Sequence, residues 1–68
     1  MDPNANLAEQ EELLQEISEY GRDTHHPACI NAQRDLIDVR QALYDWLRDG
    51  GYEPDWNRAP NARKHYGR

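Results

Sequence analysis

The sequence predicts an all-α protein: an antiparallel two-helix hairpin, then an aromatic C-terminal turn that folds back and a basic tail, the whole assembled as a helical-bundle dimer. Two observations indicate the hairpin. A long segment and a shorter one both repeat apolar residues at the spacing of a helix face, and a glycine follows the end of each. The width of the longer apolar face indicates the dimer.

The size and composition of the chain indicate one small domain that needs extra stabilisation. With 68 residues it lies near the size at which buried apolar surface barely offsets the entropy lost on folding. A hydrophobic fraction of 37% and a mean hydropathy of −1.19 are low for a self-sufficient core. We therefore expect a second copy or another protein to contribute.

The first helix is predicted at 7–20. Residues 1–6 read as a lead-in, because Pro3 and two asparagines disfavour a helix interior. Asn6 precedes Leu7 and has Glu9 three positions later, which is the spacing of a capping box. Gln10 occupies the position that would complete the apolar seam. The apolar face comprises Leu7, Leu13, Leu14, Ile17 and Tyr20.

The connection between the helices is short and polar. Gly21 follows the first helix, where a left-handed residue commonly closes a helix, and Pro27 suits the first turn of the second. Either Thr24 or His26 is expected to be the N-cap of the second helix. The few residues between the helices predict an antiparallel arrangement.

The second helix is predicted at 27–49, and it carries a wide apolar surface. One face repeats at spacings of three and four, and a flank of Ile30, Ile37 and Tyr44 repeats at intervals of seven, with Leu47 extending it. The first helix is too short to cover this surface. We therefore expect the flank to dock a second chain in a four-helix arrangement. The inner face comprises Cys29, Ala32, Leu36, Val39, Leu43 and Trp46.

The C-terminal part is predicted to fold back first and then to extend. Gly50 and Gly51 end the second helix, and Tyr52 and Trp56 are expected to return to its apolar surface. The helical-hairpin domain is thus 1–56. Residues 57–68 carry four cations and no acid, show no periodicity, and are expected to form an extended basic tail.

No pattern of residues indicates catalysis, a metal or a cofactor. His25, His26 and Cys29 lie within one helical turn, but a structural zinc site normally needs four ligands, so a polar turn and a buried thiol are the preferred interpretation. Glu12, Glu16 and Glu19 share a face with no histidine or nucleophile nearby, which is typical of a solvated surface. The prediction is a non-enzymatic protein without a cofactor.

The location predicted from the sequence is the cytoplasm. No apolar run is long enough to span a bilayer, and the N-terminal residues are acidic, without the basic and apolar regions of a signal peptide. Cys29 is the single cysteine, and a free thiol on an apolar helix face fits a reducing compartment.

A protein–protein interaction module is the leading functional hypothesis, with a second copy or a host protein as the partner. An alternative is nucleic-acid association through the basic tail. A further alternative is an acidic nucleic-acid mimic, because residues 1–23 hold seven acids and one arginine. The predicted protein interface is Ile30, Ile37, Tyr44, Leu47 and Trp56. The predicted nucleic-acid contacts are Arg58, Arg63, Lys64 and Arg68.

The segment from Leu43 to Trp56, LYDWLRDGGYEPDW, resembles small proteins encoded by actinobacterial phages and their hosts, in which a W-L-x-x-G-G helix end leads into an aromatic-Pro-Trp segment. No catalytic or binding motif defines that group, so the resemblance carries over no functional residue. It implies a small accessory protein of phage or bacterial origin that binds a protein in the host cytoplasm.

Overall fold

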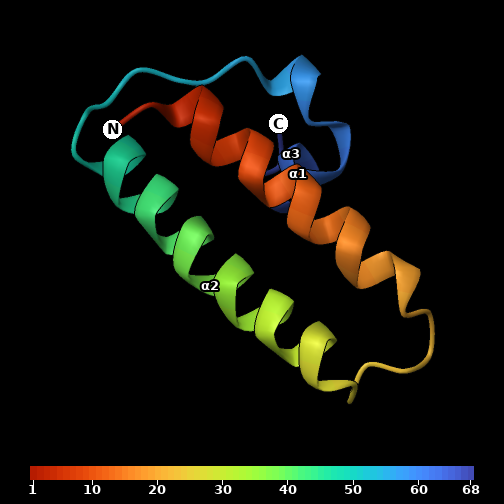
Figure 1. The fold of residues 1–68 in the computed structure, drawn as a ribbon. Helices are drawn as coiled ribbons and strands as arrows, with labels where there is room; N and C mark the ends of the chain where they lie inside the picture. The colour runs from red at the N-terminus through yellow and green to blue at the C-terminus, as the bar shows by residue number, and fades with distance from the viewer.

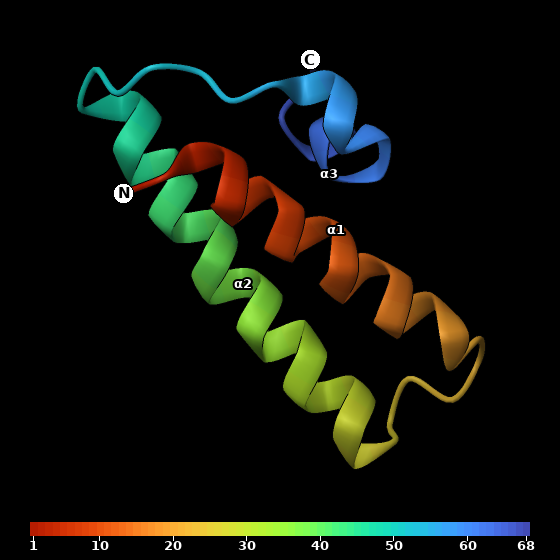
Figure 2. The same ribbon diagram turned by 45° about the horizontal axis from the view of Figure 1, so that its top comes forward.

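Two long helices and a short third one make up the fold. The computed structural model describes all 68 residues, with helices α1 (Pro3–Glu19), α2 (Pro27–Arg48) and α3 (Pro60–His65) and a 3-10 helix η1 (Trp56–Arg58). Helices α1 and α2 lie antiparallel and side by side, and α3 lies against α1 (Figures 1 and 2). The all-α prediction and the hairpin are confirmed.

Helix α1 begins four residues earlier than the sequence predicts. Asp2 is the N-cap, and its carboxylate accepts hydrogen bonds from the backbone N–H of Asn4 (3.0 Å) and of Ala5 (3.3 Å). Pro3 then occupies the first helical position, where its missing N–H costs nothing. The prediction of a lead-in capped by Asn6 is wrong, because Asp2 caps the helix and Pro3 begins it.

The turn between the long helices agrees with the prediction, and it shows which residue is the N-cap of α2. Gly21 has a φ of 56°, the left-handed conformation expected after a helix end. His26, and not Thr24, is the N-cap of α2, because its Nδ1 accepts a hydrogen bond from the N–H of Ala28 at 3.1 Å. The ring of Tyr20 lies 5.0 Å from that of His26 and covers this turn.

The aromatic turn after α2 folds back as predicted. The indole Nε1 of Trp46 donates a hydrogen bond to the carbonyl oxygen of Tyr52 at 2.9 Å, and the two rings meet edge to face. The Trp46 ring lies so close to Gly51 that no Cβ would fit there. Trp56 reaches the core, so the turn crosses from the end of α2 towards α1 (Figure 1).

The prediction of an extended basic tail at 57–68 is wrong, because this segment supplies half of the main core. The core cluster consists of Leu7 from α1, Leu43 from α2, and Ala59 and Ala62 from the C-terminal segment. Helix α3 therefore packs on the hairpin as a third helix instead of leaving it as an independent domain. The partly buried side chains around the cluster are Leu14, Trp46, Leu47, Trp56 and Tyr66.

The other half of the hairpin, near the turn, lies beyond the end of α3. Its buried residues on α2 are Cys29, Ala32 and Leu36. Cysteine and alanine are small side chains that let two helix backbones approach closely. The hairpin thus has a three-helix end and a two-helix end.

Candidate interaction surface

A carboxylate from α1 holds the start of α3. Glu11 accepts hydrogen bonds from the N–H of Asn61 (3.3 Å), the side-chain amide of Asn61 (2.9 Å) and the N–H of Ala62 (2.9 Å). The N-cap residue of α3, Ala59, has no side-chain oxygen to do this itself. Glu11 thus acts as a cap from another helix, where a negative charge also suits the helix dipole.

A buried polar network holds the end of α3. Gln10 is fully buried, and its side-chain amide donates to Asn6 Oδ1 at 2.7 Å and to the Tyr66 hydroxyl at 2.9 Å. Asn6 in turn donates to the carbonyl oxygen of Val39 at 3.0 Å. The glutamine that interrupts the apolar seam of α1 therefore joins all three helices, since buried amides need partners.

Charged side chains of the C-terminal segment are engaged within the chain. Arg58 pairs with Asp55 at 3.3 Å, and Arg68 pairs with Glu53 at 3.0 Å. The guanidinium of Arg68 also lies 5.7 Å from the centre of the Trp56 ring. Two of the four cations predicted to contact nucleic acid are thus held in ion pairs.

An exposed apolar stripe runs along α2 outside the core. Ile30, Ile37 and Tyr44, named here the α2 stripe, have exposed fractions of 38%, 65% and 43%. Leu47 and Trp56 were predicted to belong to the same interface, but both are partly buried against the core cluster. Both pack against the cluster that includes Ala59 and Ala62, so the exposed surface is narrower than the sequence predicts.

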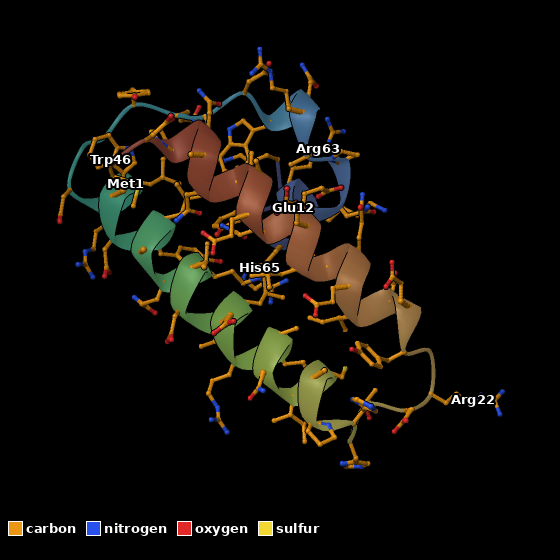
Figure 3. The ribbon with its side chains drawn as sticks, viewed as in Figure 1. Met1, Glu12, Arg22, Trp46, Arg63 and His65 are labelled. Carbon is orange, nitrogen blue, oxygen red and sulfur yellow. The ribbon has the colours of Figure 1, made fainter.

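The α2 stripe begins where α3 ends. The Tyr44 ring contacts His65 and Tyr66, at centroid distances of 5.7 and 4.9 Å. In the view of Figure 3, His65 appears in projection between α1 and α2, and its side chain is exposed. Ile37 and Ile30 continue from Tyr44 towards the interhelical turn, beyond the last residue of α3. Helix α3 therefore contacts the stripe only at Tyr44, and it leaves Ile37 and Ile30 uncovered nearer the interhelical turn.

The groups at the end of α3 have shifted acid–base equilibria. Burial, and secondly the charge of Arg40, lower the pKa of His65 below its ordinary value of 6.5, so its imidazole is neutral at neutral pH. Burial raises the pKa of Tyr66 above 10.0, although its hydrogen bond with Gln10 acts in the opposite direction. The stripe is thus bordered at this end by uncharged aromatic groups.

The raised pKa of Tyr66 predicts a loss of stability in alkali. The folded state favours the neutral phenol, so this contribution is complete below pH 10.0 and is lost as the pH rises through the folded-state pKa. Urea unfolding at a series of alkaline pH values should show the free energy of unfolding falling more steeply in the wild type than in Tyr66→Phe. Equal slopes would contradict the assignment.

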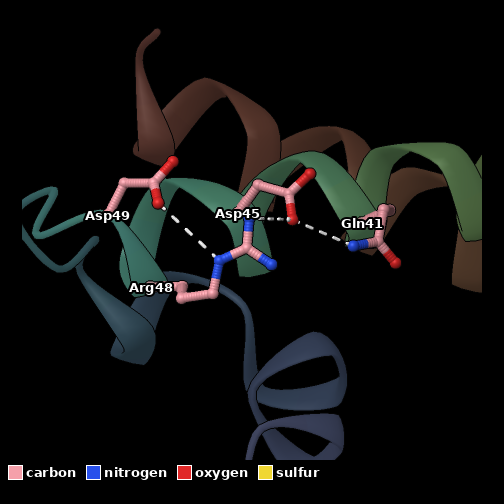
Figure 4. Close-up of polar contacts among 4 residues, drawn as sticks. All are labelled: Gln41, Asp45, Arg48 and Asp49. Carbon is pink, nitrogen blue, oxygen red and sulfur yellow. Dashed lines mark hydrogen bonds and ion pairs between the residues drawn. The ribbon is translucent and has the colours of Figure 1, made fainter.

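The border of the stripe that faces away from the core, named here the outer border, carries charges of both signs. Near the end of α2, Asp45 accepts a hydrogen bond from Gln41 at 3.0 Å and pairs with Arg48 at 3.2 Å, and Arg48 also lies 3.7 Å from Asp49 (Figure 4). About two and three turns before Asp45, Asp38 and Arg34 are exposed and form no ion pair within the chain. These two charges are available to another molecule.

The residues weighed as metal ligands or acids do not converge on one site. His26 caps α2, and Cys29 is fully buried with the Gln33 amide 3.2 Å from its Sγ. No group of three or more histidine, cysteine or carboxylate side chains is arranged to hold a metal ion, and no pocket opens on the surface. Glu12, Glu16 and Glu19 are exposed. No helix combines the length and apolar character needed to cross a membrane.

The sequence interpretation missed the residues that fix α3. Ala59, Ala62 and Tyr66 follow one another at spacings of three and four, the pattern of one helix face, and this was the available signal. Glu11 gives no local signal, because its partners lie about fifty residues away in the chain.

The chain matches no family model, and neither a curated protein nor a solved structure shows significant similarity to it.

Proposed function

We propose that this protein is a non-enzymatic protein-binding module that acts through the α2 stripe. The observation that carries the proposal is the exposure of Ile30, Ile37 and Tyr44 at seven-residue intervals on one helix face. Apolar side chains repeated in this way form the seam along which a second helix docks. The chain's own third helix ends beside Tyr44, and its C-cap residue Tyr66 reaches the backbone oxygen of Arg40, while Ile37 stays 65% exposed.

Charge favours this function over nucleic-acid binding. The formal net charge is −5, and Arg58 and Arg68 are engaged with Asp55 and Glu53. Binding along a phosphate backbone relies on cations that are free to replace counterions. The proposed setting is the cytoplasm of a bacterial cell, following the resemblance of the segment from Leu43 to Trp56, with a host protein or a second copy as the partner.

Photo-cross-linking in bacterial cells tests the proposal. A benzophenone amino acid placed at Ile37 should give discrete protein adducts, because it replaces the most exposed residue of the stripe. The matched control places it at Ala42, which is also exposed on α2 but lies about 140° further around the helix. Adducts from position 37 and none from position 42 are expected. No adducts from position 37, or equal adducts from both, would contradict the function.

A further inference from the structure

We propose that the α2 stripe docks a second copy of this chain, with the two α2 helices antiparallel about a two-fold axis at Ile37. This inference rests on the proposed function and names its partner. Three features support this pairing, namely the spacing of the stripe, the charges along its outer border and the position of α3.

The spacing of the stripe is symmetric about its central residue. Ile30 and Tyr44 each lie seven residues from Ile37, which is two helical turns or about 10.5 Å along the axis. When two such helices pair antiparallel about Ile37, each Ile37 meets its own copy. Ile30 then meets Tyr44 of the partner subunit, so the larger aromatic side chain packs against a smaller aliphatic one at both ends. A two-fold interface requires this self-complementarity.

The charges on the outer border fit the antiparallel arrangement. Antiparallel pairing about a two-fold axis brings the same border of both helices together. Arg34 then lies about 3 Å along the axis from Asp38 of the partner subunit, and the symmetry makes two such pairs. Neither side chain has an ion-pair partner within its own chain, whereas Arg48 is already paired with Asp45.

A parallel arrangement would leave Arg34 without such a partner. It would set the outer border of one helix against the inner border of the other, which carries Gln33, Arg40 and Leu47 and no carboxylate. Arg34 would then lie level with an amide, Gln33, and about 9 Å along the axis from Arg40, although Asp38 would lie about 3 Å from Arg40 of the partner subunit. Helix α3 also lies along that inner side, where Tyr66 and His65 contact Tyr44. The antiparallel pair is favoured because it alone gives Arg34 a carboxylate partner and keeps α3 away from the interface.

The three partly exposed side chains of each stripe can bury less area than the roughly 800 Å² per partner of a standard interface. The dimer is therefore a weak one, with a dissociation constant in the micromolar range.

Sedimentation equilibrium over low-micromolar to near-millimolar concentrations tests the pairing. The wild-type chain should pass from monomer to dimer, and Ile37→Glu should weaken association at least about tenfold, because it places two carboxylates at the centre of the interface. Ala42→Glu adds the same charge on exposed α2 surface outside the stripe and should leave the dissociation constant unchanged. Circular dichroism should show both variants as helical as the wild type.

A charge exchange tests the antiparallel register. Arg34→Glu alone and Asp38→Lys alone should each weaken the dimer about five- to tenfold, since each variant sets like charges opposite one another twice. The double variant should recover most of the affinity. A double variant no tighter than the single ones would overturn the antiparallel pairing.

Other outcomes separate this inference from the function on which it rests. A wild-type chain that stays monomeric at every concentration overturns self-pairing. Cross-linked adducts from position 37 with the mass of two copies would support it, whereas adducts with a different protein would overturn it and leave the protein-binding function standing. An Ile37→Glu chain that unfolds would show that Ile37 is core, and would overturn both.

Discussion

Leu43→Ala is expected to lower the free energy of unfolding by about 2–5 kcal/mol. Leu43 is fully buried in the core cluster, where α2 meets Leu7 of α1 and Ala59 and Ala62 of the C-terminal segment. Truncation removes apolar contacts with both neighbours and leaves a cavity that a small core cannot fill. A domain of this size has a total stability of roughly 3–10 kcal/mol, so the variant should lose a large part of it and unfold at a clearly lower temperature.

Urea unfolding monitored by far-ultraviolet circular dichroism measures this loss. Ile37→Ala is the matched control, because it also truncates a branched aliphatic residue on α2 but at an exposed position. At concentrations where the chain is monomeric it should change the free energy of unfolding by no more than about 0.5 kcal/mol. Equal losses in the two variants would contradict the placement of the core.

Glu11→Ala is expected to lower the free energy of unfolding by about 1–3 kcal/mol. The variant removes all three hydrogen bonds that the carboxylate accepts from Asn61 and Ala62 at the start of α3. A helix of six residues has no stability of its own, so α3 should separate from the hairpin more often. In the variant, hydrogen exchange of the amides of 61–66 should be faster than in the wild type, and this increase should be larger than the increase in α2.

Glu12→Ala is the control for this prediction. Glu12 is the next residue on α1, it carries the same charge, and it is exposed with no hydrogen bond or ion pair (Figure 3). Its removal should leave the stability and the exchange rates of α3 nearly unchanged. If Glu12→Ala loosened α3 as much as Glu11→Ala, general charge and not the cap would hold the helix.

The hairpin could be predicted because its signals are local. The apolar spacing of α2, the glycine after each long helix and the proline at position 27 all act within a few residues of the ends that they define. The start of α1 was missed although its signal is local too. Proline by itself disfavours a helix interior, whereas after the Asp2 cap Pro3 occupies the first helical position, where it favours a helix start.

Helix α3 was missed because its stabilising groups come from elsewhere in the chain. Asparagine, proline and glycine in 57–68 favour an extended segment when only local propensity is considered. Glu11 and Gln10 override that propensity through contacts with Ala62 and Tyr66, which single-sequence patterns do not reveal. In the sequence alone, Gln10 stands only as a gap in an apolar seam.

The candidate surface was predictable in position but not in extent. The seven-residue spacing placed Ile30, Ile37 and Tyr44 on one flank, and all three are exposed. Leu47 and Trp56 share the apolar character of that flank but contact the core, because the C-terminal segment folds over them. The predicted role of the stripe as an interface follows from this exposure and stays a prediction.

Backbone amide shifts recorded by NMR during a concentration series test the central claim most directly, namely that another chain docks on the α2 stripe. Rising concentration should perturb the amides around Ile30, Arg34, Ile37 and Tyr44, while the amides near the exposed Glu12, Glu16 and Glu19 of α1 stay constant. Perturbations confined to the basic C-terminal residues or to α1 would contradict it, because association would then use a different surface.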